Sequence, residues 1–214
     1  MGRPIAQTVT VAAAVATGYA ESQSLGAAGP LTLNGSLVTG GVGIPTHPAR
    51  ATVASAGDDH LISFIFVGTI VDPGNPLNTL PYTETVAGTN AGSSSTVHDF
   101  ATITSISGSA ATASTVTAGT LATASSPWVP WDVNVRTQFE VGFGVTVLTS
   151  TTWQLEVTLD DIYDTTVTPT AVVYNSLSGK TDNETGGITA VVRASRLTLT
   201  AAGSARLSQI QQGD

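Results

Sequence analysis

Carboxylate side chains gather at one point of the chain, where Asp160, Asp161 and Asp164 follow a strand-like run. A hard cation such as Ca²⁺ binds several oxygen ligands, and these three residues can supply three of them. The spacing differs from that of an EF-hand loop, because the glycine and the terminal glutamate of that loop are missing. Three carboxylates in an acidic chain are more typical of a solvated turn, so we predict no metal site.

A second group of titratable residues comprises Asp58, Asp59 and His60. Successive side chains of a strand point to opposite faces, so these three converge only at a turn, and we interpret them as turn caps. His47 and His98 are isolated in the sequence, and the many serines include no Gly-x-Ser-x-Gly element. Cysteine is absent, which excludes thiolate catalysis and cysteine-based zinc sites. We therefore predict that the protein is not an enzyme and needs no cofactor.

Two tryptophans offer flat surfaces for binding. Trp128 and Trp131 can stack on sugar rings as in carbohydrate-binding modules, and that reading would make the chain a glycan-binding adhesin. Their neighbours Pro127 and Pro130 stiffen the backbone beside them. The combination favours a segment whose indole rings anchor a domain linker or a subunit contact.

Three arginines, Arg193, Arg196 and Arg206, carry three of the seven positive charges of the chain. Arginine is favoured at protein interfaces, which points to an acidic neighbouring subunit, and ion pairs within the domain are the equal alternative. Apolar residues of a predicted N-terminal strand complete our candidate interface, which consists of Val9, Val11, Trp128, Trp131, Arg193, Arg196 and Arg206.

The elements that must position these residues are predicted to be short β-strands. No segment shows the 3.6-residue apolar period of an amphipathic helix. The apolar runs 61–67 and 82–86 flank a turn-rich break, which predicts a hairpin with a long exposed loop over residues 72–80. Between Trp153 and Leu159 every second residue is apolar, which predicts a strand whose wet face carries Gln154, Glu156 and Thr158.

These strands predict an all-β fold with two antiparallel β-sandwich or jelly-roll-like domains. Residues 1–29 are small and rich in Ala and Gly, and we expect an extended N-terminal arm or strand that packs on the domain body or on a neighbouring subunit. Residues 30–124 are predicted to form the first domain, 125–131 a Pro/Trp linker and 132–214 the second domain. Deleting residues 1–25 should then weaken assembly while the core still folds.

The composition limits the classes of partner. Charged residues make up 10% of the 214 residues, against roughly 25% in average soluble domains. A surface so poor in charge suits a protein whose faces are covered by neighbours, and it argues against a freely diffusing enzyme. The net charge of -8 opposes contact with nucleic acid, which requires a basic surface, and with an anionic membrane. We therefore predict neither as a partner.

Strand-and-turn patterns of a familiar kind recur in seven segments, namely residues 31–41, 50–59, 64–68, 82–88, 100–106, 152–164 and 193–199. Together these segments resemble structural proteins of tailed bacteriophage virions. The resemblance implies a capsid decoration (cement) protein, or alternatively an accessory protein of the tail or connector, and it supplies no catalytic residue. It also implies the virion as location, the major capsid protein or other virion subunits as partners, and a homo-oligomer.

Overall fold

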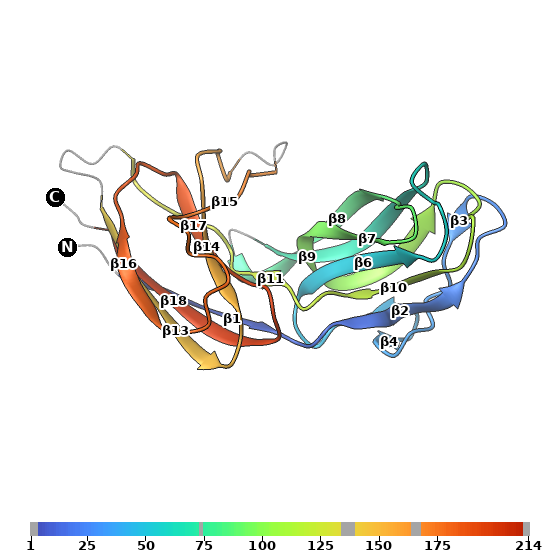
Figure 1. Ribbon diagram of the computed structural model, residues 1–214, viewed down its shortest axis with the longest axis horizontal. Helices are drawn as coiled ribbons and strands as arrows, with labels where there is room; N and C mark the ends of the chain where they lie inside the picture. Colours follow the sequence, from blue (N-terminus) through green and yellow to red (C-terminus); the bar gives the residue numbers. More distant parts are fainter. Residues whose placement is uncertain (1–3, 73–74, 134–139, 164–167, 212–214) are drawn as a thin grey trace. The chain divides into compact units, whose positions relative to one another are not determined.

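The computed structural model describes residues 4–72, 75–133, 140–163 and 168–211. Every regular element in these ranges is a β-strand, and every strand pair is antiparallel (Figure 1). The predicted all-β, antiparallel class is therefore confirmed. The described ranges hold no helix with the length and apolar character needed to cross a membrane.

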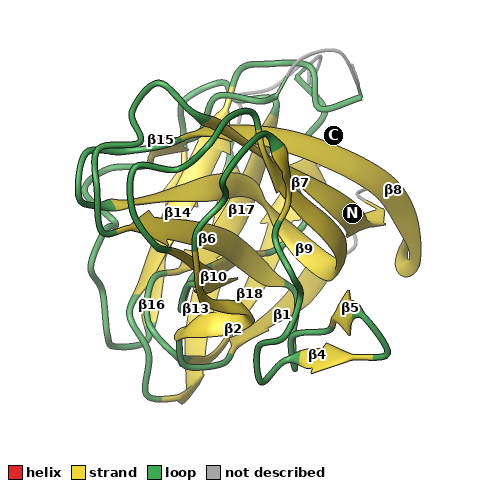
Figure 2. Cartoon of the chain, turned by 90° about the vertical axis from the view of Figure 1, so that its right-hand side faces the viewer, coloured by secondary structure: helices red, strands yellow, loops and turns green. Residues whose placement is uncertain are grey.

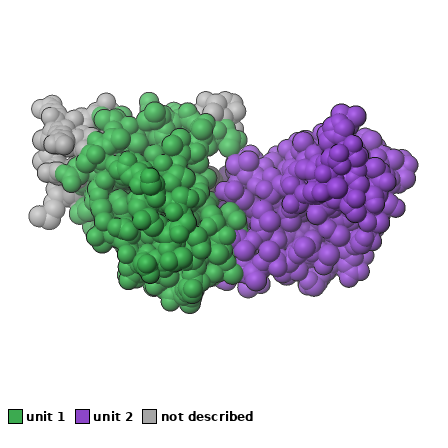
Figure 3. All heavy atoms as spheres, viewed as in Figure 1, with its two compact units in different colours: residues 1–11, 123–214 green, residues 12–122 purple. Residues whose placement is uncertain are grey.

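The chain divides into two compact units, which Figure 3 colours separately. Unit 1 comprises Met1–Val11 and Thr123–Asp214, and unit 2 comprises Ala12–Ala122. Each unit has a hydrophobic core of its own. The first strand of the chain thus belongs to the unit that the C-terminal half builds.

Unit 1 contains two sheets. In the four-stranded sheet the strand order is β1 (Ile5–Val11), β18 (Gly203–Gln211), β13 (Val141–Thr149) and β16 (Glu184–Ile188). In the second sheet the order is β11 (Ala124–Ser125), β17 (Ala194–Leu199), β14 (Trp153–Thr158) and β15 (Val172–Val173), with β12 (Val129–Pro130) also paired to β17. Apolar residues from the inner faces of both sheets form the core around the fully buried Trp153.

Unit 2 contains a single sheet that includes the long hairpin of β7 (Ser63–Asp72) and β8 (Asn75–Ala87). Its main path is β2 (Val15–Gln23), β10 (Val116–Thr120), β6 (Ala49–Ser55), β9 (Ser93–Gly108), β5 (Val42–Gly43) and β4 (Val38–Thr39). Strand β3 (Gly29–Pro30) pairs with β9, and β7 pairs with both β8 and β9. Phe64, Phe66 and Phe100 are completely buried in this core.

The hairpin continues through much of the predicted loop over residues 72–80. Strand β8 begins at Asn75, which pairs with Asp72, and after a register shift its residues from Thr79 to Ala87 pair with β7. Just beyond the predicted loop the strand also includes a proline, because proline is tolerated in an edge strand at positions whose N–H would point away from the partner. Pro81 occupies such a position, opposite Thr69.

Gly68 lies where β7 approaches β9 most tightly. A Cβ atom on Gly68 would lie 1.9 Å from the carbonyl oxygen of Thr102, a separation that no side chain can adopt. The pairing of β7 with β9 shifts register beside Gly68, so the glycine and this irregularity occur together. The absence of a side chain at residue 68 is thus a condition for joining the hairpin to the sheet.

Replacing Gly68 by alanine is expected to lower the free energy of unfolding of unit 2 by about 2 to 3 kcal/mol, because the two strands must separate to admit a methyl group. Gly29→Ala is the matched control, since a methyl group on residue 29 would have no other atom within 4 Å. Hydrogen exchange of peptides from β7 and β9 measures the difference. Equal protection in the two variants would contradict the close approach.

Residues 1–29 do not form an arm in the structure. Strand β1 pairs with β18 in an unbroken register over its seven residues, and β2 pairs with β10 in unit 2. Val9 and Val11, which we expected at a subunit interface, are 5% and 3% exposed and belong to the core of unit 1. The physical reason is their alternation with Thr8 and Thr10, which makes one face of β1 apolar.

The segment predicted as a linker, residues 125–131, is part of unit 1. Both β11 and β12 pair with β17, and the backbone N–H of Trp131 donates to the carbonyl of Arg193 at 2.9 Å. The chain passes between the units at residues 11–12 and 122–123 instead. The Pro and Trp residues mark a strip packed onto a sheet rather than a free connection.

Candidate functional site

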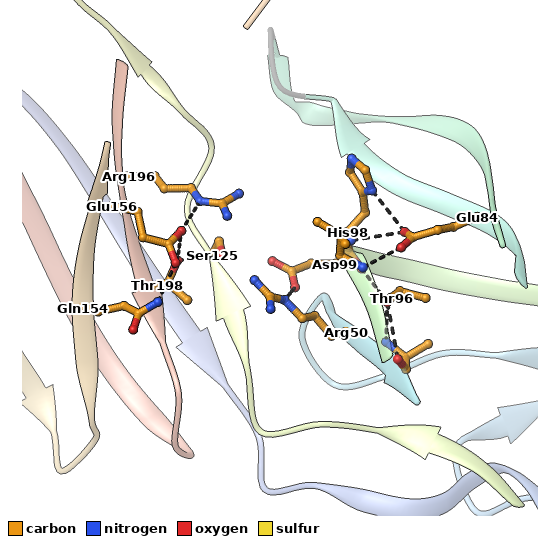
Figure 4. A network of polar contacts seen from close by, with 12 residues as sticks. Arg50, Glu84, Thr96, His98, Asp99, Ser125, Gln154, Glu156, Arg196 and Thr198 are labelled. Atoms are coloured by element: carbon orange, nitrogen blue, oxygen red, sulfur yellow. Dashed lines mark hydrogen bonds and ion pairs between the residues drawn. The ribbon is translucent and has the colours of Figure 1, made fainter. Parts of the chain in front are cut away.

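A polar cluster in unit 2 surrounds His98 on β9 (Figure 4). Glu84 Oε2 lies 3.0 Å from His98 Nδ1, and the Tyr82 hydroxyl lies 3.3 Å from His98 Nε2. The rings of Tyr82 and His98 are 4.4 Å apart between centroids. The side chain of Glu84 is 13% exposed, so its charge is largely removed from water.

A β-bulge in β9 explains why Glu84 is held at this position. Residues 96–98 of β9 stand opposite one residue of β6, so extra backbone groups leave the ladder. The Glu84 carboxylate accepts hydrogen bonds from the backbone N–H groups of Val97 (2.5 Å) and His98 (3.2 Å). The Thr96 hydroxyl donates to the carbonyl of His98 at 2.9 Å.

The electrostatics of the cluster favour an ionised Glu84. Burial acts to raise the pKa of Glu84, but hydrogen bonds from the His98 side chain and from the backbone of Val97 and His98 outweigh it and hold the pKa below its usual range. The order Tyr82, His98, Glu84 is that of a proton relay. Because the carboxylate serves the backbone of the bulge as well as the imidazole, we assign the cluster a structural role.

Replacing Glu84 by glutamine is expected to destabilise unit 2 by about 2 kcal/mol, because a neutral amide loses the charge-assisted bonds to the bulge. In the wild type the pKa of Glu84 is lower in the folded than in the unfolded state. The carboxylate therefore contributes its full stabilisation of unit 2 above the usual glutamate pKa, and this stabilisation is lost as the pH falls through the lowered pKa of the folded state.

Amide exchange at Val97 and His98 measures both effects. In Glu84→Gln these two amides should be less protected, and their protection should no longer fall as the pH is lowered through the pKa of Glu84. Thr85→Val, an exposed change on the same strand, is the control and should keep the protection of the wild type. Slow exchange of both amides in Glu84→Gln would show that the carboxylate does not hold the bulge.

Unit 1 has a buried carboxylate of its own, Glu156 on β14, which is 5% exposed (Figure 4). Its Oε2 accepts hydrogen bonds from Arg196 Nε (2.7 Å) and Thr198 Oγ1 (2.9 Å), and its Oε1 accepts one from Gln154 Nε2 (2.5 Å). Burial acts to raise the pKa of Glu156, but the Arg196 charge and these hydrogen bonds hold it below its usual range. The Arg196 guanidinium in turn lies 4.4 Å from the centre of the Trp128 ring.

The predicted wet face of β14 is wrong for two of its three residues. Glu156 and Thr158 are buried, whereas Leu159, which we expected on the apolar side, is 70% exposed. The strip of residues 125–130 pairs with β17 and lays Trp128 against Arg196, so this side of the sheet is covered as well. Alternation in the sequence reports the two faces of a strand but not what covers them.

The structure does not bring the three candidate arginines together. Arg196 is enclosed between Glu156 and Trp128. Arg206 is exposed and alternates with buried residues of β18, so it lies on the outer face of the other sheet. Arg193 is exposed just before β17.

Trp131 is buried, and its indole Nε1 donates a hydrogen bond to Ser195 Oγ at 2.8 Å. Its ring edge contributes to a small pocket at the end of unit 1 where β14 ends and β17 begins. The residues that line this pocket are Pro130, Trp131, Val133, Asp161, Ile162, Tyr163 and Arg193. Two of our candidate interface residues, Trp131 and Arg193, therefore meet here beside Asp161, although sequence patterns did not connect them.

The carboxylates after β14 act as caps of their own loop. Asp160 Oδ2 accepts a hydrogen bond from the backbone of Thr170 (2.6 Å), which lowers the pKa of Asp160, and Asp161 Oδ1 accepts one from Tyr163 N (3.0 Å). Asp164 lies outside the described residues. Within the described ranges, no three His, Cys, Asp or Glu side chains are grouped so as to hold a metal ion.

The group Asp58, Asp59 and His60, which we interpreted as turn caps, lies in a segment of bends and turns between β6 and β7. Asp58 Oδ1 lies 2.6 Å from His60 Nδ1 at the surface, and this hydrogen bond lowers the pKa of Asp58. Asp59 turns inward, is 1% exposed, and accepts hydrogen bonds from Ser55 Oγ (2.5 Å) and Ala113 N (2.7 Å). The buried aspartate ties two loops of unit 2 together. His47 is half-buried, away from the groups above in sequence.

The fold and these clusters define an all-β protein with two cores and a buried, partnered carboxylate in each unit. No family model matches the chain, and no curated protein has a significantly similar sequence. Sequence patterns did not reveal the cluster at His98, whose partners are 14 and 16 residues away. The one signal that could have found it was Glu84 itself, which shares the inward positions of β8 with the buried Val86.

Proposed function

We propose that the chain is a structural protein of a tailed-phage virion, and specifically a decoration (cement) protein that stabilises the capsid through contacts with the major capsid protein and with other copies. The observation that carries this proposal is a set of exposed apolar residues on the segments that follow β14, pair with its end and precede β17. We call it the end surface, and it consists of Leu159, Tyr163, Val172, Val173 and Val191.

The strand pairing supports placing these residues together. Leu159 directly follows β14, and Val172 and Val173 pair with the end of β14 at Val157 and Glu156. Val191 precedes Arg193, whose N–H donates to the carbonyl of Thr158 at 2.9 Å. Monomeric proteins seldom expose large apolar side chains in groups, so a group of this kind favours a covered surface.

The charge content supports the same role. A chain with 10% charged residues leaves few charges to be desolvated when its faces meet neighbours. Repetition over a symmetric shell multiplies contacts that are individually weak. We interpret unit 1, in which two sheets share one core, as a sandwich-like domain, a scaffold that presents loops and edges rather than a catalytic cleft.

A tail or connector accessory protein would use the same end surface and is the second candidate. The glycan-binding alternative loses support, because both of its tryptophans already have partners. Trp128 stacks on Arg196, and Trp131 is buried with its indole N–H bonded to Ser195.

Binding to phage particles that lack the protein tests the proposal. Leu159→Asp and Val191→Asp place charge on the end surface and are expected to abolish binding, while Leu148→Asp, at an exposed apolar residue of β13, leaves it intact. Electron microscopy of the loaded particles then separates capsid from tail. Failure of the wild-type protein to bind any part of the particle would refute the proposal.

A further inference from the structure

Strand β8 is an edge of its sheet. It pairs with β7 along one side, and no strand of the described chain pairs with its other side (Figure 2). The side chains of Thr79, Pro81, Thr83 and Thr85 are all exposed along this edge. A free edge of this length is a template for another strand.

The pairing identifies which backbone groups point outward. Gly88 N donates to Ile62 O at 2.7 Å, and Pro81, which has no N–H, sits within the regular ladder opposite Thr69. Antiparallel pairs alternate between hydrogen-bonded and non-bonded positions, so even-numbered residues of β8 bond to β7. The N–H and C=O groups of Thr79, Thr83 and Thr85 therefore face away from the sheet. In the described part of the chain, none of these three amides donates a hydrogen bond.

Between Thr79 and Ala87 the usual protection of an edge is weak. Natural edges carry outward charges, bulges or prolines. The one charged residue of β8 is Glu84, and its carboxylate is turned onto His98 and the bulge of β9. Pro81 removes a single donor. The bulge contacts also hold β8 firmly against the unit, so its free edge is presented in a defined shape.

We propose that two copies of this chain pair through β8, antiparallel and about a two-fold axis at Thr83. In this register Thr83 meets its own copy, and the N–H of Thr85 donates to the C=O of Pro81 in the second copy. The missing proline donor therefore disrupts the pairing little. The even-numbered residues, which lie on the opposite face of β8 from Thr83, are complementary as well. Tyr82 lies opposite Glu84 of the second copy, and Leu80 lies opposite Val86.

Two alternative two-fold registers are worse, which favours the axis at Thr83. An axis at Pro81 places two prolines opposite each other, so the central pair has no donor. An axis at Thr85 places Glu84 against Val86 of the second copy, so a carboxylate meets an apolar residue that is 7% exposed. The sequence of β8 thus favours pairing with a second β8 about Thr83 over these two alternatives.

The inference deepens the proposed structural role, on which its biological use rests, since it names one contact between copies. Edge pairing of a single strand buries less than the standard interface, so we expect a weak dimer that becomes significant when many copies are held close together. The pairing itself is tested on the isolated protein. A result that contradicts the β8 pairing therefore leaves the proposed virion role open, and failure to bind phage particles leaves the pairing open.

Disulfide trapping tests the axis directly, because the natural chain has no cysteine. Residues opposite each other in bonded pairs have Cα atoms roughly 5.5 Å apart, which a disulfide can span. Thr83→Cys is expected to form a covalent dimer under mild oxidation. Thr79→Cys is the matched control on the same edge, since two copies of residue 79 would lie roughly 27 Å apart in this register. Equal trapping of both variants, or of neither, would overturn the proposal.

Sedimentation of the full chain over a wide range of concentration gives the second measurement. Thr83→Pro removes the central N–H donor from both copies and is expected to weaken dimerisation roughly ten- to a hundredfold. Thr83→Val retains this N–H and should dimerise like the wild type. Pro81 shows that β8 accepts proline at an outward position without losing its ladder to β7. A wild-type protein that stays monomeric at every concentration would rule out the pairing.

Discussion

Removal of residues 1–11 is expected to unfold unit 1 while unit 2 stays folded. Val9 and Val11 are buried in the core of unit 1, and β1 forms an entire edge of its four-stranded sheet. Burial of each valine contributes about 1.5 to 3 kcal/mol, and the ladder to β18 adds to this. The sum is about 5 kcal/mol or more, which is comparable with the whole stability of a small domain.

Tryptophan fluorescence during urea unfolding measures this loss selectively. All three tryptophans, Trp128, Trp131 and Trp153, belong to unit 1, so their emission follows that unit alone. The truncated protein should show the emission of unfolded protein without denaturant. A peptide with the sequence of residues 1–11, added in trans, should restore the folded signal by strand addition.

Thr8→Ala is the control, because Thr8 is exposed and points away from the core of unit 1. Val9→Asn should reproduce much of the truncation by burying an amide in an apolar core. If the truncated protein kept the wild-type fluorescence transition, β1 would be a dispensable arm, as the sequence alone suggested.

Replacing Glu156 by leucine is expected to lower the stability of unit 1 by about 4 kcal/mol, because Arg196 keeps a charge that is largely buried and loses its partner. The side chain of Arg196 is 14% exposed, so water can compensate little of that charge. The shift of the tryptophan transition in urea gives the magnitude.

The double variant Glu156→Leu/Arg196→Met separates charge from packing. It removes both ions, so most of the loss should be recovered if the unpaired charge is its cause. Glu184→Ala breaks the exposed contact of Glu184 with Lys180 (3.9 Å) and should change stability little. Equal losses in the single and double variants would assign the effect to packing instead.

The same ion pair contributes to the response of unit 1 to acid. The pKa of Glu156 is lower in the folded than in the unfolded state. The carboxylate therefore contributes its full stabilisation of unit 1 above the usual glutamate pKa, and this stabilisation is lost as the pH falls through the lowered pKa of the folded state. In Glu156→Leu this part of the pH dependence should disappear.

Local patterns in the sequence were sufficient to predict the all-β class and the β7–β8 pairing of apolar runs. These features depend on local rules: the two-residue period of a strand, turn chemistry, and the absence of a helical stripe. They hold wherever a strand finally lies in the molecule.

The unit that each segment joins, and the polar residues that become buried, depend on the tertiary structure. Val9 was a reasonable interface residue until β18, almost 200 positions later, proved to be its partner. Glu156 was predicted on the wet face of its strand until Arg196 proved to enclose it, and Glu84 drew no prediction before the bulge of β9 was seen to bind it. Alternation assigns a residue to one face of a strand, whereas the element that covers that face arrives from distant sequence, and local preferences carry no information about it.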